Sequence, residues 1–531
     1  MTVHSYLRKN GPSLTSQVIA AMQADGVSAG AARQRITRSQ ATYKRLAGLR
    51  FEKNARFLYL DDQYGSDEFW LALEEAFEAS GKAYWGAAAG LRARGGACPK
   101  HMFPAVCGAP LARTGQLSPE RVLERLTAIK FLREDRDEVT GESIIRFNPQ
   151  SYPKIADARM RALLLAEYIA LQAIREWARR LGFGSYGKFR LRGDSEPPIV
   201  SGITWDLTAP SYMRPLAKLQ NGGIKPGFFV CDLNLNGPIG RDSVALFLRK
   251  HDMASAPPGV APIFPFFIGE VFTQAAYDLA RSNGIVATTV GDLFGADIAK
   301  ALRNLIDLLS DAGATAAVNP EHLHTVMTSL SKIEGAADNL RGALFELVSG
   351  ALAKDVEGGY LTTGQKVTDY QTGRAAEVDV LVMNKEKSEL LIVECKSKIP
   401  GAAVSASEVQ KWYTDRVPLI EKALRANPYY SEIKMRFELW SNGPFSSDAL
   451  DWLKSQKLTV PGSIHGWKDG GALKDYARKS QSAAIRKILN EHYFNHPLAK
   501  AARNRQKPWD RLAIFAAMSY PLRIYAPNEK L

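Results

Sequence analysis

The chain has 531 residues, a hydrophobic content of 46% and a formal net charge of +14. A prior of about 150 residues per domain predicts three or four domains, each with an ordinary buried core. No apolar run reaches the roughly 18 residues that a membrane-spanning helix needs, and residues 1–12 lack the apolar stretch of a signal peptide. Four cysteines without paired spacing indicate a reducing compartment. We therefore expect a cytoplasmic protein with no membrane partner.

The positive charge is concentrated at the start of the chain. Residues 1–60 contain ten basic and two acidic side chains, which gives this segment a net charge of +8. A concentrated basic segment is typical of phosphate binding, which points to a nucleic acid as the partner. A solvated basic surface without a partner is the alternative.

The same segment contains the elements of a winged helix. Residues 13–23 suit a first helix, Ser28 can cap a second helix over 29–39, and residues 46–59 alternate like a two-stranded wing. We assign residues 1–64 to a winged-helix DNA-binding domain, although such domains also bind proteins. The expected DNA contacts are the basic side chains on or beside the second helix and wing: Arg33, Arg35, Arg38, Lys44, Arg45 and Lys53.

Residues 65–155 suit a second winged-helix-like domain. Its expected helices and strands are 67–79, 82–94, 118–129, 131–132 and 143–147. Cys98, His101 and Cys107 lie close together in this domain, but a structural zinc site needs four ligands and no fourth is near. We do not expect zinc at this position.

Two apolar strands near residue 390 each carry a charged group at one end. Asp379 interrupts the first strand, and Glu394 and Lys396 lie two residues apart at the end of the second. Because strand side chains alternate between faces, Glu394 and Lys396 share a face and Cys395 points the other way. The polar segment 384–388 between the strands predicts a hairpin, and a hairpin brings Asp379 near Glu394.

Such a group of charges has a chemical use. Two neighbouring carboxylates repel each other, and a hard divalent cation such as Mg²⁺ removes that repulsion. A water molecule on the cation can act as a nucleophile, and a nearby lysine can orient that water or stabilise charge on a phosphate. A surface ion pair between Glu394 and Lys396 is the alternative interpretation.

This pattern resembles the catalytic core of the PD-(D/E)XK, or restriction-endonuclease-like, nucleases, whose further acid lies on an earlier helix. The matching residues are Asp379, Glu394-Cys395-Lys396 and Glu346. The resemblance implies that Asp379, Glu394, Glu346 and the backbone carbonyl of Cys395 hold Mg²⁺ or Mn²⁺, and that Lys396 positions or activates the nucleophile. It also implies a contact from Gln410, for which a solvated helix face is an equal alternative, and Glu377 is a rival to Asp379 as ligand.

Residues 156–300 resemble a degenerate copy of the same pattern. Asp206 precedes Asp232-Leu233-Asn234, which follows an apolar strand as Glu394-Cys395-Lys396 does, and Glu176 is the upstream helical acid. Asn234 cannot supply the charge of a lysine, so we expect an inactive scaffold or DNA clamp. Metal binding by Asp206 and Asp232, or an unrelated α/β domain, are the alternatives.

The predicted fold class is a multidomain α/β and α+β protein. Residues 301–335 form a helical linker, and residues 336–531 form the catalytic domain with C-terminal helices and a basic patch around Lys500. The resemblance, including a type IV restriction-like loop over 441–445, implies a metal-dependent DNA endonuclease of restriction or anti-phage defence. A DNA-binding regulator or assembly subunit, and a repair or recombination nuclease, are the alternatives. A homodimer is a further possible partner, and a motor or sensor would be a separate subunit because no phosphate-binding loop is present.

Overall fold

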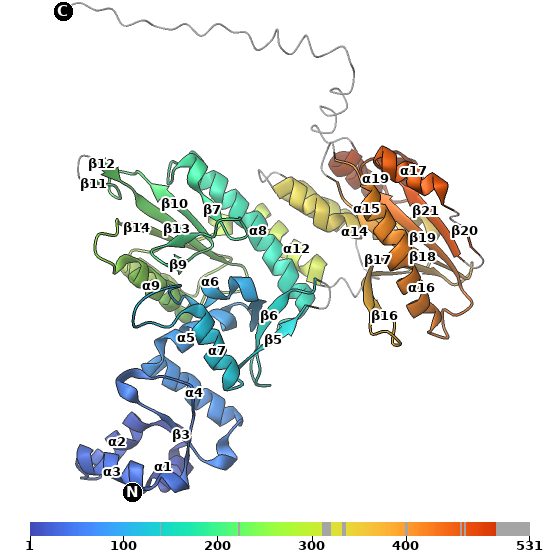
Figure 1. Ribbon diagram of the computed structural model, residues 1–531. Coiled ribbons are helices and arrows are strands. Elements are labelled where there is room, and N and C mark those ends of the chain that lie inside the picture. Colours follow the sequence, from blue (N-terminus) through green and yellow to red (C-terminus); the bar gives the residue numbers. More distant parts are fainter. Residues whose placement is uncertain are drawn as a thin grey trace, which may run out of the picture. The chain divides into compact units, whose positions relative to one another are not determined.

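The computed structural model describes residues 1–137, 140–220, 223–310, 320–331, 336–398, 402–456, 459–460 and 463–494. The chain is a mixed α/β protein with several small sheets (Figure 1). It divides into two compact units, the first comprising Met1–Ser310 and the second built from α13 and the chain from Ala337 onward. In the described part of the chain, no helix is long and apolar enough to cross a membrane. The basic patch predicted around Lys500 lies outside the described residues.

The first unit begins with three helices and a small antiparallel sheet of order β1-β3-β2. Its elements are α1 (Val3–Asn10), β1 (Ser13–Leu14), α2 (Thr15–Ala24), α3 (Ala29–Arg38), β2 (Lys44–Arg45) and β3 (Phe57–Tyr59). The prediction of a first helix over 13–23 is wrong at its start, because Ser13 and Leu14 pair with β3. A helix that the sequence analysis missed, α1, precedes it and is capped by the side chain of Thr2.

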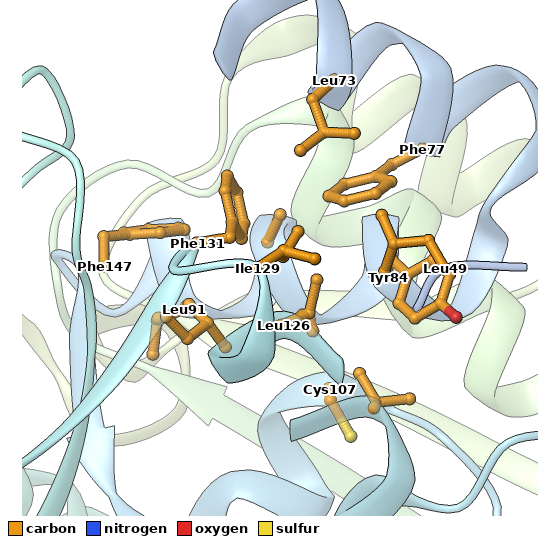
Figure 2. Packing of buried hydrophobic residues seen from close by; sticks show 14 of the residues in the cluster. Leu49, Leu73, Phe77, Tyr84, Leu91, Cys107, Leu126, Ile129, Phe131 and Phe147 are labelled. Carbon is orange, nitrogen blue, oxygen red and sulfur yellow. The ribbon is translucent and has the colours of Figure 1, made fainter. Parts of the chain in front are cut away.

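A second small sheet, of order β4-β6-β5, repeats this arrangement. The elements here are α4 (Asp67–Ser80), α5 (Lys82–Ala93), β4 (Ala97–Pro99), α6 (Phe103–Cys107), α7 (Pro119–Ala128), β5 (Leu132–Arg136) and β6 (Ser143–Phe147). Figure 2 shows the apolar core, in which the ring of Phe131 meets those of Phe77 and Phe147 edge-on at 5.6 and 5.5 Å. Cys98 and Cys107 are buried, and burial raises the pKa of both thiols to about 12. They are therefore protonated core residues.

The rest of the first unit is a five-stranded sheet of order β15-β14-β13-β10-β7. Its elements are α8 (Asp157–Arg180), β7 (Arg190–Leu191), β10 (Leu207–Ser211), β13 (Gly227–Asn234), α9 (Arg241–Ser255), β14 (Ile263–Gly269), α10 (Gln274–Ser282), β15 (Val286–Thr289), α11 (Val290–Phe294) and α12 (Ala296–Ser310). Two hairpins accompany them, β8 (Ile199–Val200) with β9 (Ile203–Thr204) and β11 (Lys218–Gln220) with β12 (Gly223–Lys225). Helix α12 packs against α8.

The second unit has a six-stranded sheet of order β16-β17-β18-β19-β21-β20. The helices that precede the sheet and its first three strands are α13 (Pro320–Leu330), α14 (Ala336–Glu357), β16 (Tyr360–Thr368), β17 (Ala375–Asn384) and β18 (Glu389–Lys396). Then follow α15 (Ala406–Gln410), the π-helix η7 (Lys411–Arg416), α16 (Val417–Arg425), β19 (Lys434–Ser441), α17 (Ser447–Ser455), β20 (Thr459–Val460), β21 (Ser463–Lys468), α18 (Gly470–Ala477), α19 (Ala483–Ile488) and the π-helix η8 (Leu489–Phe494).

The two larger sheets have the same connectivity. In each, a long helix precedes three antiparallel strands, and a helix then leads to a parallel strand, a further helix and another parallel strand. Strands β10, β13, β14 and β15 of the first unit thus correspond to β17, β18, β19 and β21 of the second. The internal repetition seen in the sequence is therefore a repetition of topology.

Candidate active site

The paired strands β17 and β18 bring the predicted acids together. Leu381 pairs with Ile392 in the antiparallel register. Asp379 lies two residues before Leu381, and Glu394 lies two residues after Ile392, and the two carboxylates are near enough for the charge of Glu394 to raise the pKa of Asp379. The hairpin predicted between the strands is confirmed. The candidate site lies at the end of the two strands that is remote from the hairpin turn.

Short hydrogen bonds fix the charged groups of this site. The backbone N–H of Cys395 donates to Oδ2 of Asp379 at 2.7 Å. The ammonium of Lys396 donates to Oε1 of Glu394, also at 2.7 Å. The Glu394 side chain is only 5% exposed, whereas that of Lys396 is 30% exposed. A buried carboxylate with a reachable ammonium beside it is thus held at the end of β18.

The carboxyl groups perturb one another because they lie close together in a buried place. Burial, followed by the charges of Glu394 and Glu346, raises the pKa of Asp379 well above its ordinary value. Burial, followed by Glu377 and Glu394, raises the pKa of Glu346 on α14 to about 7. The predicted helical acid Glu346 therefore belongs to the same electrostatic group as the two strand acids.

One oxygen of the site lacks a partner. Oε2 of Glu394 is buried and accepts no hydrogen bond from any residue that the structure describes. A buried, unpaired carboxylate oxygen is costly unless a cation or a donor satisfies it. Oxygen ligands on neighbouring acids are what Mg²⁺ and Mn²⁺ prefer. The donor atoms of Asp379 and Glu394 therefore suit a hard divalent cation, and Glu346 is a further acid of the same electrostatic group.

A residue that the sequence analysis missed also reaches the site. Arg416, the last residue of η7, places Nη1 4.0 Å from Oε1 of Glu394 and donates from Nη2 to the carbonyl of Glu377 at 2.6 Å. Gln410 ends α15 with an exposed side chain, for which no hydrogen bond to these carboxylates is found in the described residues. The signal for Arg416 is weak in the sequence, because its approach depends on the rare π-helical turn.

The upstream sheet repeats this backbone geometry. The N–H of Leu233 donates to Oδ2 of Asp206 at 2.9 Å, as the N–H of Cys395 does to Asp379. Asp206, Asp232 and Asn234 thus take the places that the sequence assigned to them. The predicted helical acid Glu176 is wrong, because it pairs with Arg175 and Arg179 on its own helix. Glu167, an earlier residue of α8, is the acid buried beside Asp206.

Arginine and lysine side chains neutralise the upstream acids. Arg94 lies 2.5 Å from Glu167 and 3.4 Å from Asp206, and it donates to the carbonyl of Leu233 at 3.1 Å. Arg192 contacts the same two carboxylates at 2.7 and 3.0 Å.

The third acid, Asp232, is paired with Lys250 at 2.5 Å. Burial by itself would raise the pKa of Asp206, but Arg192 and Arg94 outweigh it and hold that pKa below its ordinary value. Two topologically equivalent aspartates, Asp206 and Asp379, therefore have opposite pKa shifts.

The basic residues predicted to contact DNA lie on the surface of the first unit. Helix α3 buries Ala32 and Ile36 and exposes the arginines Arg33, Arg35 and Arg38. In the described residues, none of these three arginines forms an ion pair with an acidic side chain. The other predicted contacts, Lys44, Arg45 and Lys53, are also exposed, and Lys44 lies 3.7 Å from Asp61.

No family model matches the sequence, and no curated protein matches it. Solved structures with some similarity include a protein of unknown function, AF1548, at a TM-score of 0.18 and 13% identity, covering 30% of this chain and 97% of that chain. The restriction endonuclease MspJI in complex with a 27-mer oligonucleotide has a TM-score of 0.18 and 14% identity over 36% of this chain and 42% of its own. The DNA modification-dependent restriction endonuclease AspBHI has a TM-score of 0.17 and 12% identity, covering 45% of this chain and 63% of its own.

This chain therefore spans less than two thirds of each of these two DNA endonucleases. At such TM-scores the likeness carries no argument, and the proposals below rest on the residues of the site itself.

Proposed function

We propose that this protein is a metal-dependent DNA endonuclease whose active site lies in the second unit. The observation that carries the proposal is the group of buried acids around Asp379 and Glu394, in which the pKa of Asp379 is raised and Oε2 of Glu394 has no hydrogen-bond partner in the described residues. The same positions upstream are balanced by arginine and lysine. The first unit's five-stranded sheet is then the inactive copy and the second unit's sheet is the catalytic, restriction-endonuclease-like domain.

The proposed roles follow from the contacts. Asp379, Glu394 and Glu346 would hold Mg²⁺ or Mn²⁺, and the resemblance to the PD-(D/E)XK nucleases adds the backbone carbonyl of Cys395. When bound, the cation supplies Lewis acidity and lowers the pKa of a coordinated water. Lys396 is anchored on Glu394 and still partly exposed, so its ammonium can orient the attacking water and stabilise charge on the scissile phosphate. Arg416 adds a second positive charge on the same side of Glu394.

The first unit supplies the proposed DNA-reading surface. Apart from the additional helix α4, its two small domains have the same order of helices and strands and the same strand order, as a pair of winged helices would. The exposed arginines of α3 then contact DNA together with Lys44, Arg45 and Lys53. A basic DNA-binding module joined to a nuclease in one chain suits restriction or anti-phage defence in the cytoplasm.

Replacing Lys396 by Ala tests the catalytic assignment. We expect Mg²⁺-dependent nicking of plasmid DNA to fall by roughly 100-fold or more, because the water and the phosphate lose their positioning charge. Binding of Mn²⁺, measured by calorimetry, should persist in this variant and be lost in Asp379→Asn.

Lys385→Ala is the matched control, because that lysine lies in the turn between β17 and β18 and contacts the rings of Tyr360 and Tyr429. It should cut like the wild type, and Asp206→Asn should still bind Mn²⁺. Undiminished cutting by Lys396→Ala would contradict the assigned role.

A non-catalytic DNA-binding subunit is the second candidate function. The upstream sheet favours this candidate. Its acids are paired with arginine and lysine side chains, so one of the two repeated sheets in this chain already has no unpaired acidic group at the equivalent positions. Wild-type protein that binds Mn²⁺ and DNA but leaves plasmid, linear and branched substrates intact would support this candidate.

A further inference from the structure

A second group of metal-ligand side chains lies in the second unit and shares no residue with the acidic site. His324 is on α13, and Glu491 and His492 are adjacent residues of the π-helix η8. Nε2 of His324 lies 3.1 Å from Oε2 of Glu491. One ligand atom from each of the three residues lies within 4.8 Å of the other two. The group therefore already has the compactness that a single bound ion requires.

The packing of the two helices explains how these side chains meet. Helix α13 buries Leu323, Val326, Met327 and Leu330, and it packs against α19, which continues directly into η8. Within η8, Leu489, Tyr493 and Phe494 are buried. The apolar contacts fix the two elements relative to each other, and they leave His324 and His492 half-buried at the edge of that contact and Glu491 exposed beside them.

The π-helical turn is the local feature that allows two adjacent residues to serve one site. A π-helix turns through a smaller angle per residue than an α-helix, so neighbouring side chains point in more similar directions. Such turns are rare and are often found at functional sites. Here the turn brings Glu491 and His492 to the same side, facing His324.

We propose that His324, Glu491 and His492 form a site for a zinc-class divalent cation. Two imidazole nitrogens and one carboxylate oxygen are a donor set that suits Zn²⁺, Ni²⁺ and Co²⁺, whereas Mg²⁺ and Mn²⁺ prefer oxygen ligands. The fourth tetrahedral position remains open to a water or an exogenous ligand. The ion would join α13 to a segment 167 residues further along the chain, and so would stabilise the second unit against local unfolding.

The test uses full-length protein carrying Asp379→Asn and Glu394→Gln, so that Zn²⁺ cannot be taken up by the acidic site. Calorimetric titration with Zn²⁺ in excess Mg²⁺ should give one ion per chain. His324→Ala and His492→Ala should each weaken this binding at least about tenfold. Co²⁺ added instead should produce the visible absorption of a tetrahedral site with nitrogen ligands.

His322→Ala is the matched control, because His322 is an exposed residue two positions from His324 on the same helix. It should bind Zn²⁺ like the parent protein. Far-UV circular dichroism of each variant checks folding, and His324→Asp, which keeps a ligand atom, should recover part of the affinity. Zn²⁺ binding that is equal in the parent and in both alanine variants, or no binding by the parent, would overturn the proposal.

Discussion

The fold raises the pKa of the Glu346 carboxyl group to near neutral pH. Burial and the charges of Glu377 and Glu394 raise its pKa from 4.5 to about 7. Between these two values the folded, metal-free protein binds more protons than the unfolded chain. The contribution of Glu346 to the free energy of unfolding therefore decreases as the pH rises through this window, and it increases as the pH falls through it.

Metal binding should show the opposite dependence on pH, because a cation requires the ionised carboxylate. We expect the affinity for Mn²⁺ to rise as the pH increases from about 6 to about 8, with release of protons on binding. Glu346→Gln should remove the part of this dependence centred near pH 7. Calorimetry in two buffers of different ionisation enthalpy measures both effects. An unchanged pH profile in Glu346→Gln would contradict a role for Glu346 in the site.

Pairs of strands decide where the reactive groups lie. In β16 and β17 the register pairs Thr363 with Val380 and Gln365 with Val378, which leaves Gly364 and Asp379 between them. Gly364 has a φ of +60°, in the left-handed region that favours glycine. The register is the same on both sides of this position, so no residue is inserted, and Gly364 lies directly opposite Asp379.

In the upstream sheet the acids are present, but side chains of the protein itself supply the positive charge beside them. Arg94 follows α5 and reaches across to acids on α8 and next to β10. Removing one partner of such a buried network leaves charges without compensation.

We expect Arg94→Ala to destabilise the first unit by about 3 kcal/mol. Hydrogen exchange at the amides of Leu233 and Leu235, which donate to Asp206 and Glu167, measures the effect. Arg92→Ala is the control. That arginine pairs with Glu74 at the surface and is 43% exposed, so its loss should cost at most about 1 kcal/mol. Equal protection in both variants would show that the Arg94 network does not stabilise this unit.

Over the whole molecule, positive charge is concentrated in one terminal region and the proposed chemistry lies in another. The first 60 residues carry a net charge of +8 out of +14 for the entire chain. A nuclease of this organisation would gain most of its DNA affinity from phosphate contacts in the first unit, while the second unit contributes the cutting step. Cleavage of both strands by one active site per chain would favour a homodimer.

DNA affinity should therefore fall steeply with salt, with a log–log slope near −0.9 for each phosphate neutralised. Replacing Arg33, Arg35 and Arg38 together by Ala should weaken binding and make this slope shallower by up to about 3. Fluorescence anisotropy over a range of salt concentrations measures it, with Arg478→Ala in the second unit, an exposed arginine next to α18, as control. A slope that is the same in the triple variant and the wild type would contradict α3 as the DNA contact.

The sequence by itself determined the charge distribution and the placement of the strand acids. The apolar runs and the polar turn between them are local features, so the order of residues was enough to predict the hairpin of β17 and β18 and the approach of Asp379 to Glu394. The repeated topology was also visible, because apolar strands and the acids at their ends follow the same order in both copies. The domain boundaries, the winged-helix assignment and the DNA contacts stay predictions.

Only the tertiary structure decided in which copy two buried arginines neutralise the acids. Arg94 lies more than 100 residues before Asp206 in the sequence, and no local pattern indicates that its guanidinium reaches these acids. The same reason explains the choice of Glu167 over Glu176, the approach of Arg416 and the meeting of His324 with Glu491. Long-range packing determines which ionisable side chains are buried next to one another. Burial then makes each charge costly unless an opposite charge or a hydrogen bond compensates it.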